Sequence, residues 1–416
     1  MHSISCRRTG ALYSAFQRHF GAVRVISTTN RHLLASDAQV AAAADIYDAP
    51  TRDYRTVIQG RTGKPASASE GLKQSWLGNL GLKLQASFPT LYWLGEGGRR
   101  YQRNAVNFGA QLVRSTGITH LFSSFPPYAD HCIAYRLKRA FPHLVWIADF
   151  RDLHIDPTQN NLMFRRYQRR VNRRILHHAD IVTTVSEGLA EHLRALHHNV
   201  FVVRNGLTLR PADAQPYKKF TIAYTGSMFQ DKRRPEPLLQ AIADGLQQGV
   251  LAREDLSVVY AGKDGEVWRD KMKQFGLEDL LQEKGVVAPE AAREIQQRAH
   301  LNLLLTYSTS SLKGNLTGKL YDYLEAGRPI IALINGPHDP ELAAVVEGAQ
   351  AGTIFDHTTP PEDLLRFIES LYTGWKRTGR VAWTGDRAFL ASLQWEEIVD
   401  RFIEQAGVSQ TWRAHV

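Results

Sequence analysis

The sequence predicts an α/β protein with two doubly wound domains, each built on a parallel sheet with helices on both faces. Short runs of β-branched residues alternate with helical patterns along nearly all of the 416 residues, which is the α/β signal. The expected strands are continuously apolar, as in sheets that are buried on both faces. A chain of this length also suits two or three domains of ordinary size.

One interruption divides this alternation. Residues 205–217 contain Gly206, Pro211 and Pro216, and a new strand is expected directly afterwards, at Phe220. The expected division is residues 1–210 for an N-terminal domain, 211–390 for a second domain, and 391–416 for a C-terminal helix that packs back toward the first domain.

In the first domain the apolar runs predict strands at Val23–Ser27, His120–Ser124, Leu144–Asp149, Ile181–Val185 and Val200–Val203, with Tyr54–Ile58 as a weaker candidate. Helical patterns lie at Thr9–Phe20, Tyr101–Ser115, Asp130–Ala140, Met163–His178 and Glu187–His197.

The second domain repeats this order. Strands are expected at Phe220–Tyr224, Leu256–Ala261, Leu301–Leu305, Ile330–Leu333 and Gly352–Phe355. Helices are expected at Arg234–Gln248, Glu290–Ala299 and Lys319–Ala326.

The beginning of the chain departs from this pattern. A doubly wound domain normally opens with a strand that lies centrally in the sheet, whereas here the first element is the helix at Thr9–Phe20. Either the fold is modified or the chain lacks its natural start. Because the loss of a central strand would leave ladder groups unpaired, we favour a missing start and expect an N-terminal domain that lacks its first strand.

Composition and charge narrow the function classes. Hydrophobic residues make up 43% and charged residues 22%, as in ordinary globular proteins. The sequence has no apolar run long enough for a membrane-spanning helix, and Cys6 and Cys132 are too few for a disulfide scaffold or a cysteine-rich metal site. The net charge of +10 is uneven, with about +14 on residues 1–205 and about −4 on 206–416. A basic half indicates an anionic partner.

The most informative stretch is Asn315–Leu333, in which a Gly-containing loop leads into a helix that begins near Thr317–Lys319. Free backbone N–H groups at a helix N-terminus suit a phosphate, and Lys319 adds a cation in the first turn. Asp322 lies on the same helical face and could accept hydrogen bonds from ribose hydroxyls. The alternative is an ordinary loop–helix–strand unit with a solvated Lys and Asp.

A second loop follows the strand at Phe220–Tyr224. Gly226 allows the backbone to approach a ligand closely, and Lys232 or Arg233 could reach a diphosphate. Two loops at strand ends, each with a glycine and a cation, fit one diphosphate bound outside the carboxyl ends of a parallel sheet.

Together these stretches resemble the glycosyltransferases of the two-Rossmann-domain architecture (GT-B), in the large retaining family 4-like group. The resemblance is carried by Gly-Lys-Leu-Tyr-Asp-Tyr-Leu-Glu-Ala-Gly-Arg-Pro at 318–329, Tyr-Thr-Gly-Ser at 224–227 with Lys232, Ala-Asp-Ile-Val-Thr-Thr-Val-Ser-Glu at 179–187 followed by Val-Arg-Asn-Gly at 203–206, Ser-Ser-Phe-Pro-Pro-Tyr-Ala-Asp-His at 123–131 and Trp-Ile-Ala-Asp-Phe-Arg-Asp at 146–152. It covers nearly the whole chain after residue 9.

The resemblance implies two domains facing a central cleft and a hexosyltransferase that uses a nucleoside-diphosphate sugar as donor substrate and no further cofactor. It implies transfer to a hydroxyl of a glycan or lipid-linked acceptor, with retention, in polysaccharide or glycolipid biosynthesis. The donor residues carried over are Gly226, Ser227, Lys232, Thr317, Gly318, Lys319 and Asp322. The nucleotide base is expected near the turn Gly285–Pro289.

The sequence also departs from the family. Of the two Glu that the family often has eight positions apart, the first falls on Gly314 and the second on Asp322. The family's phosphate-binding Arg falls on Ser227. Of the Gly-rich loop in the first domain, only Arg8–Gly10 remains. The diphosphate would therefore rest on Lys232, Lys319 and backbone amides.

The acceptor side is expected in the first domain. Asp149, Arg151 and Asp152 cluster at a strand end, where they could orient an acceptor hydroxyl, or alternatively form an internal salt bridge. His131 could face the cleft as a further catalytic residue, and a packing role is the alternative.

Residues 164–176 form a basic amphipathic helix with Phe164, Tyr167, Val171 and Ile175 at helical spacing. It would lie on an anionic membrane surface or, alternatively, be a core-facing helix with a solvated Arg face. We expect a cytoplasmic protein, with contact to the inner face of the membrane if the first alternative holds.

Three other function classes stay open. A sugar-nucleotide epimerase shares the architecture but needs acid and base groups in the cleft, and a non-catalytic nucleotide-sugar-binding protein would fit the missing first Glu. A nucleic-acid binder has no matching motif, so we expect no nucleic acid as partner. The histidine pairs lack carboxylates at ligand spacing and no Asp-x-Asp follows a strand, so no metal site is expected.

Overall fold

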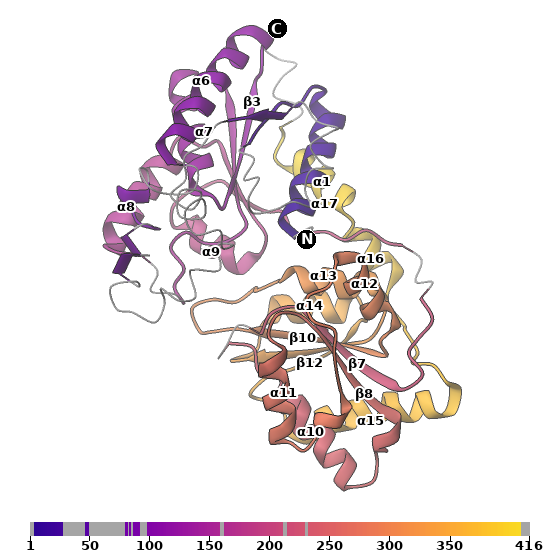
Figure 1. The fold of residues 1–416 in the computed structure, drawn as a ribbon. Coiled ribbons are helices and arrows are strands. Elements are labelled where there is room, and N and C mark those ends of the chain that lie inside the picture. Colours follow the sequence, from indigo (N-terminus) through magenta and orange to yellow (C-terminus); the bar gives the residue numbers. More distant parts are fainter. Residues whose placement is uncertain are drawn as a thin grey trace. The chain divides into compact units, whose positions relative to one another are not determined.

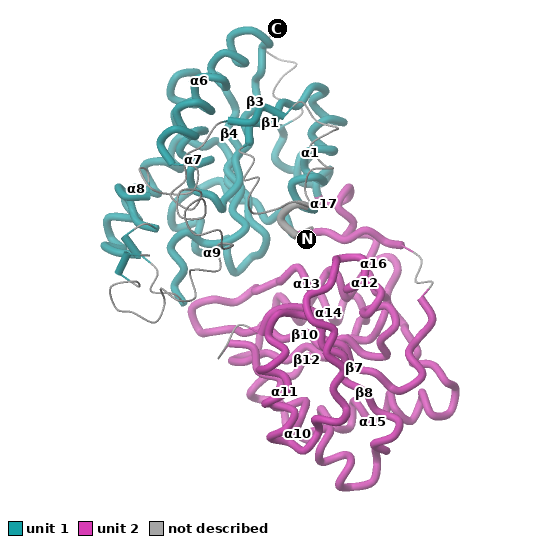
Figure 2. The backbone as a smooth tube through the Cα atoms, viewed as in Figure 1, with its two compact units in different colours: residues 1–204, 399–416 teal, residues 205–398 magenta. Residues whose placement is uncertain are grey.

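The computed structural model describes residues 4–27, 46–49, 80–81, 83–84, 86–91, 98–158, 162–210, 214–228 and 232–408. The chain forms two compact units, shown in different colours in Figure 2. Unit 1 comprises Met1–Arg204 and Val399–Val416, and unit 2 comprises Asn205–Ile398. The boundaries thus lie at 204/205 and 398/399, whereas the sequence analysis placed them after residues 210 and 390.

Unit 1 contains the indigo, purple and magenta elements of Figure 1. These are α1 Ile4–Phe20, β1 Val25–Ser27, β2 Ile46–Asp48, α6 Gly98–Thr116, β3 His120–Phe125, α7 Tyr128–Ala140, β4 Val145–Phe150, α8 Arg165–Leu176, β5 Ile181–Thr184, α9 Glu187–Arg194 and β6 Val200–Val202. Four strands form a parallel sheet in the order β3-β4-β5-β6, while β1 pairs in parallel with β2. Within the described residues no strand precedes α1, as the sequence predicts.

Two details of unit 1 differ from the sequence-based expectation or fall outside it. The strand β2 was not predicted, because Ile46–Asp48 is only three residues long and is flanked by a run of alanines that favours helix. The weaker strand candidate at residues 54–58 lies outside the described residues.

Unit 2 is a doubly wound domain. Its elements are β7 Phe220–Thr225, α10 Glu236–Gln247, the 3₁₀ turn Arg253–Asp255, β8 Leu256–Ala261, α11 Gly265–Gln274, the 3₁₀ turn Glu278–Leu280, β9 Leu281–Glu283, α12 Pro289–Arg298, β10 Leu301–Tyr307, α13 Gly318–Ala326, β11 Ile330–Asn335, α14 Pro340–Gly348, β12 Gly352–Phe355, α15 Pro361–Thr378 and α16 Arg387–Ser392. The last helix, α17 Trp395–Gln405, runs across the 398/399 boundary.

The six strands of unit 2 are all parallel, in the order β12-β11-β10-β7-β8-β9. The chain winds outward from β7 through β8 to β9, then returns to β10 and winds the other way. The strand order therefore reverses between β7 and β10, which is the topological switch point of a Rossmann-type sheet.

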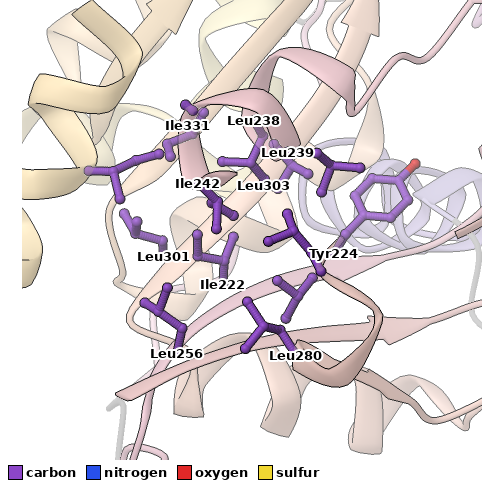
Figure 3. Packing of buried hydrophobic residues seen from close by; sticks show 14 of the residues in the cluster. Ile222, Tyr224, Leu238, Leu239, Ile242, Leu256, Leu280, Leu301, Leu303 and Ile331 are labelled. Carbon is purple, nitrogen blue, oxygen red and sulfur yellow. The ribbon is translucent and has the colours of Figure 1, made fainter. Parts of the chain in front are cut away.

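The core of unit 2 lies between this sheet and its covering helices. Ile222 of β7 and Leu303 of β10 pack with Leu238 and Leu239 of α10, and none of them is more than 2% exposed (Figure 3). Replacing such a buried aliphatic side chain with alanine costs about 2–5 kcal/mol of stability. This core fixes the strand ends that carry the functional loops.

The strand β9 was not predicted. Leu281–Glu283 has one half-buried and two exposed residues, so it lacks the apolar run that marks the other strands. It forms because its backbone completes the ladder beside β8, from Val258–Leu281 to Tyr260–Glu283.

The buried face of α8 also differs from the apolar stripe in the sequence. Phe164 and Tyr167 are 70% and 47% exposed, while Gln168 and Asn172 are buried. Phe164 immediately precedes the helix, with a left-handed backbone (φ 51°).

The side-chain amides of Gln168 and Asn172 face inward because both have hydrogen-bond partners from distant segments. The Gln168 amide brackets the backbone of Phe88, donating to its carbonyl at 3.0 Å and accepting from its N–H at 2.8 Å. Asn172 pairs with the ring of His154 at 3.1 Å. Since buried polar groups need hydrogen bonds, the helix turns its amides inward and its aromatic residues outward.

Candidate functional site

The candidate site lies at the carboxyl edge of the unit 2 sheet, at the switch point. The loop from Gly226 follows β7, and the loop from residue 308 to Thr317 follows β10 and leads into α13. These two strands are neighbours in the sheet. Since ligands of open α/β sheets bind where the strand order reverses, the two loops predicted from the sequence lie at the expected edge.

Lys319, in the first turn of α13, crosses over Gly226. A Cβ built on Gly226, whose φ is 130°, would lie 2.1 Å from Cε and 2.5 Å from Nζ of Lys319, so only glycine leaves room for this lysine. The ammonium lies 5.2 Å from the centre of the Tyr224 ring and 3.4 Å from its hydroxyl. The structure therefore brings together two residues that are about ninety positions apart in the sequence.

The Lys319 ammonium forms no ion pair with a carboxylate among the described residues. Burial and, to a smaller extent, the nearby Arg233 lower its pKa, and Asp322 and Asp264 act in the opposite direction, so that the resulting pKa is about 7. A desolvated cation without an anionic partner is energetically unfavourable, and an incoming anion would relieve that cost.

The N-terminus of α13 adds a second anion-binding feature. Thr317 is the N-cap residue, with φ −69° and ψ 155°, but its side chain forms no capping hydrogen bond. Its Oγ1 is buried and has no hydrogen-bond partner among the described residues. The backbone N–H groups from Gly318 onward are thus not satisfied by a side-chain cap and lie beside Lys319.

Hydrogen bonds hold the first two residues after β7, Gly226 and Ser227. The carbonyl of Ser227 accepts hydrogen bonds from the Tyr224 hydroxyl at 2.7 Å and from Nη1 of Arg233 at 2.8 Å. The carbonyl of Gly226 accepts from the Tyr260 hydroxyl at 3.0 Å. These bonds fix the loop backbone directly beneath Lys319.

Lys232 lies over the ring of Tyr307 at the end of β10. Its Nζ is 4.4 Å from the ring centre and 3.3 Å from the hydroxyl. Lys232 is half-buried and has no carboxylate partner among the described residues. It is therefore a second cation placed at the carboxyl end of the sheet.

Two further sequence-predicted positions lie in the same unit. Asp322 is half-buried one turn after Lys319 and is close enough to raise the pKa of that lysine. The turn after β9 contains Gly285, whose carbonyl accepts from the N–H of Gly262 at 2.8 Å. Both positions lie at the carboxyl edge of the sheet. The resemblance implies ribose contact at Asp322 and the base near Gly285, and both contacts need that edge.

The sequence interpretation missed two acidic residues at this edge. Asp264 accepts a hydrogen bond from the N–H of Met228 at 2.8 Å and so ties the β7 loop to the start of α11. Asp339, only 1% exposed, accepts from the N–H groups of Gly314 and Asn315 at 2.8 and 3.3 Å. An aspartate directly before Pro340 is a sequence signal for an N-cap, but its second partner lies about 25 residues earlier.

In unit 1, Asp149 is fully buried and its carboxylate is occupied by internal partners. Arg8 pairs with both oxygens, at 2.6 and 3.2 Å, and Ser124 and Thr183 each donate a hydroxyl at 2.8 Å. Burial alone would raise its pKa, but Arg8 and the two hydroxyls outweigh it and hold the pKa below the usual range. This geometry favours the internal salt bridge over direct contact with an acceptor.

Arg151 and Asp152 follow Asp149 but point to different surroundings. The Arg151 guanidinium donates to the carbonyls of Phe125 and Pro126 and so braces the loop after β3. Asp152 is exposed at the surface. Within this cluster, Asp152 is the side chain free to meet a ligand from solvent.

His131 is fully buried near the start of α7. Its Nδ1 lies 2.8 Å from the hydroxyl of Ser123, which also accepts from the indole N–H of Trp146 at 2.9 Å. Burial lowers the pKa of His131 to about 3, so the ring is neutral near pH 7. The packing role is therefore favoured over proton transfer to a bound acceptor.

Among the residues that the structure describes, no group of three or more His, Cys, Asp or Glu side chains is arranged to hold a metal ion. In the same part of the chain, no helix is both long and apolar enough to cross a membrane.

Comparison with known proteins shows the fold. No family model and no curated protein sequence matches the chain. Among solved structures, the lipopolysaccharide outer core galactosyltransferase WaaB is similar with a TM-score of 0.50 and 13% identity, over 74% of this chain and 80% of that one. The sucrose-phosphate synthase of Thermosynechococcus elongatus matches with a TM-score of 0.50 and 16% identity, over 79% and 83%. TarM matches with a TM-score of 0.53 and 10% identity, over 76% and 60%.

These neighbours are glycosyltransferases of the GT-B architecture, and at such low identity the likeness concerns the fold alone. The parallel sheets, the doubly wound strand order of unit 2 and the division into two units agree with that likeness. The chain therefore has the two-domain α/β fold of the GT-B glycosyltransferases, as the sequence motifs predict.

Proposed function

We propose that the protein is a hexosyltransferase that moves a sugar from a nucleoside-diphosphate-sugar donor to a hydroxyl group of a glycan or lipid-linked acceptor. The observation that carries this proposal is Lys319. Among the described residues, this desolvated ammonium has no carboxylate partner and no side chain caps the N-terminus of α13 beside it, at the switch point of a Rossmann-type sheet. A diphosphate is the ligand chemistry that satisfies the lysine and the backbone N–H groups together.

The same geometry suits the chemistry of glycosyl transfer. When the bond between the sugar and the diphosphate breaks, negative charge develops on the departing phosphate oxygen. Lys319, Lys232 and the first N–H groups of α13 are fixed in advance and would stabilise that charge without reorganisation. Asp322 would bind the ribose, and the family resemblance implies retention of configuration at the transferred sugar.

The acceptor would be bound by unit 1. Of the residues assigned to it from the sequence, Asp152 is exposed, while Asp149, Arg151 and His131 are engaged in internal contacts. We assign Asp152 direct contact with the acceptor and the other three a positioning role. The neighbour WaaB is named for the lipopolysaccharide outer core, which supports a glycan or lipid-linked acceptor class.

Thermal unfolding in the presence of nucleoside diphosphates and nucleotide sugars tests the donor site. One nucleotide should raise the melting temperature of the wild type, since a ligand that binds only the folded state stabilises it. The shift should disappear in Lys319→Ala and persist in Lys313→Ala, which removes an exposed lysine from the same loop. If no nucleotide shifts the wild type, or if Lys319→Ala keeps the shift, the proposed donor site is wrong.

A turnover assay separates the transferase from its two alternatives. With a nucleotide sugar and an acceptor mixture, a transferase releases the nucleoside diphosphate and labels the acceptor. An epimerase converts the donor without any acceptor, and a binding protein shows the thermal shift with no turnover. The last two outcomes would contradict the proposed activity while leaving the donor site intact.

We also propose that α8 contacts an anionic membrane surface. Phe164 and Tyr167 are exposed large aromatic residues, and six arginines accompany them at positions 165, 166, 169, 170, 173 and 174. Aromatic residues that insert at the headgroup level, combined with arginines, are the features of an interfacial helix. A lipid-linked acceptor would then lie close to the enzyme.

Cosedimentation with vesicles tests this contact. Vesicles that contain phosphatidylglycerol should bind the wild type more strongly than vesicles of phosphatidylcholine alone, and added salt should weaken the binding. The double variant Phe164→Ser/Tyr167→Ser should lose binding, while Leu209→Ser, an exposed apolar residue of unit 2, should not. Equal binding by all three proteins would overturn the assignment to α8.

A further inference from the structure

A polar cavity lies in unit 2, at the sheet edge opposite to the proposed donor site. Its volume is about 690 Å³, and three segments line it: 214–218 before β7, Arg328 before β11, and residues 375–376 and 379–381 at the end of α15. Because the strands are parallel, the residues that precede β7 and β11 share the amino edge of the sheet. The residues that bind the proposed donor follow β7 and β10 and lie at the other edge.

Among the described residues, the charged side chains that line this cavity are all basic: Lys218, Arg328, Lys376 and Arg380. Of these four, only Lys376 forms an ion pair, with Asp255 at 2.7 Å. Among the described residues, no carboxylate lies within ion-pair distance of the other three cations.

Arg328 is the most enclosed of these cations. Its Nε donates to the carbonyl of Gln297 at 2.7 Å, and the two terminal nitrogens of the guanidinium have no hydrogen-bond partner in the described part of the chain. Arg328 is partly desolvated, which lowers its pKa, and no carboxylate among the described residues pairs with it. A guanidinium with two free donors on one side suits bidentate contact with a phosphate.

An aromatic wall accompanies the cations. Trp375 and Tyr217 line the cavity, and the Arg298 guanidinium lies over the Tyr217 ring, 4.5 Å from the ring centre. Trp375 packs against His300, whose ring centre is 5.7 Å away. The Nδ1 of His300 accepts from the N–H of Thr221, so its buried Nε2 carries the proton, and that atom has no partner among the described residues.

We propose that this cavity binds a phosphate group carried by a ligand with a flat, apolar part. The phosphate would lie between Arg328, Arg380 and Lys218, and the remainder of the ligand would pack on Trp375. Phosphate is favoured over carboxylate because several cations converge, and a dianion with three acceptor oxygens satisfies more of them. This site is separate from the proposed donor site and does not depend on it.

Calorimetric titration with phenyl phosphate, benzoate and inorganic phosphate tests the proposal. Phenyl phosphate should bind saturably, benzoate about tenfold more weakly because it has one charge fewer, and inorganic phosphate also more weakly because it cannot pack on Trp375. If inorganic phosphate binds as tightly as phenyl phosphate, the aromatic part of the proposal is wrong. If benzoate binds as tightly as phenyl phosphate, the phosphate assignment is wrong.

Variants locate the binding. The side chain of Arg380 forms no hydrogen bond or ion pair in the described chain, so Arg380→Gln should weaken phenyl phosphate binding about tenfold without unfolding the protein. Arg328→Gln should weaken it to a similar extent. Arg377→Gln, exposed on α15 but outside the cavity lining, is the matched control and should bind like the wild type. Lys319→Ala should also keep the binding.

The outcomes separate the two sites of unit 2. If Lys319→Ala alone loses phenyl phosphate, the ligand occupies the donor site and the cavity proposal is wrong. If none of the variants changes the affinity, or the wild type shows no saturable binding, the cavity proposal is also wrong. Neither result affects the nucleotide-induced shift in melting temperature that tests the proposed function.

Discussion

The guanidinium of Arg8 in α1 and the carboxylate of Asp149 at the end of β4 form a buried ion pair, with Nη2 and Oδ1 2.6 Å apart. Both side chains are at most 1% exposed. Arg8 also donates from Nη1 to the carbonyl of Val203 at 2.7 Å, so a single side chain joins α1, β4 and the segment after β6. The pair therefore fastens the first helix of unit 1 to the carboxyl edge of its sheet.

Removing one partner of this pair should destabilise unit 1 strongly. Arg8→Met leaves the Asp149 carboxylate buried without its cation, and the expected loss is about 3–5 kcal/mol in the free energy of unfolding. Urea denaturation of the full chain measures it. The control is Asp400→Asn, which breaks the exposed contacts of the same helix through Arg18 and His19 and should cost less than about 1 kcal/mol. Equal effects of the two variants would contradict the structural role of Arg8.

The same pair predicts a loss of stability in acid. Since the folded-state pKa of Asp149 is held below its unfolded value, the carboxylate contributes stability that is complete above the ordinary carboxyl pKa of about 3.9. That contribution is lost as the pH falls toward the lower folded value. Free energies of unfolding between about pH 5 and pH 3 should fall more steeply for the wild type than for Asp149→Asn. Parallel curves would contradict the lowered pKa.

Gly226→Ala should weaken nucleotide binding while leaving the fold intact. The new Cβ would lie 2.1 Å from Cε of Lys319, and the flexible lysine would be displaced from the site rather than the backbone. We expect nucleotide affinity to fall about tenfold or more by calorimetry, the cost of a lost charge-assisted contact. Gly249→Ala is the control, because Gly249 also has a positive φ (72°) but no atom within 4 Å of a built Cβ. An unchanged affinity in Gly226→Ala would mean that Lys319 does not need its observed position.

Donor binding should be linked to proton uptake by Lys319. With a pKa of about 7, the lysine is largely neutral at about pH 8 in the free protein. A bound diphosphate would raise the pKa of the lysine, so that the lysine takes up a proton on binding. Affinity should therefore fall as the pH rises above about 7. Titration of a nucleotide sugar in buffers of different ionisation enthalpy measures the uptake. Lys319→Arg is the control, since arginine stays protonated and should show no uptake.

Asp339 should position the donor loop rather than only stabilise the fold. Asp339→Ala removes the acceptor for the N–H groups of Gly314 and Asn315, as well as the cap of α14. We expect a stability loss of about 1–3 kcal/mol and weaker nucleotide binding. Asp386→Ala removes a comparable cap from α16, where it accepts from Phe389, and should lower stability by about 1 kcal/mol without changing nucleotide affinity. If both variants leave affinity unchanged, Asp339 has a structural role only.

Local sequence patterns predicted much of the architecture. The apolar runs at 256–261 and 352–355 are strands with those same bounds, because continuously apolar segments between turn residues leave few alternatives to a buried strand. The positions of the two glycine-containing loops were predictable for the same reason, while their role in donor binding stays a proposal. Gly226 and the Gly318–Lys319 pair lie directly after strands or at a helix start, and their chemistry follows from that local position.

The face of α8 and the role of Asp149 could not be predicted in this way. Phe164 and Tyr167 have helical spacing with Val171, but the buried face is decided by Phe88 and His154, which offer hydrogen bonds to Gln168 and Asn172. Asp149 stands at a strand end, as catalytic acids do, yet Arg8 occupies it from 141 positions away.

The sequence by itself thus determined the fold class, the parallel order of alternating elements and the two glycine-containing loops, because each depends on neighbours within about one element. Only the tertiary structure decided that Lys319 crosses Gly226, that Asp339 holds the loop at Gly314, and which charged groups have partners. Burial and ion pairing depend on which distant segments come into contact. The free-energy cost of an unpaired charge arises from its desolvation, and that desolvation exists only once those segments are packed together.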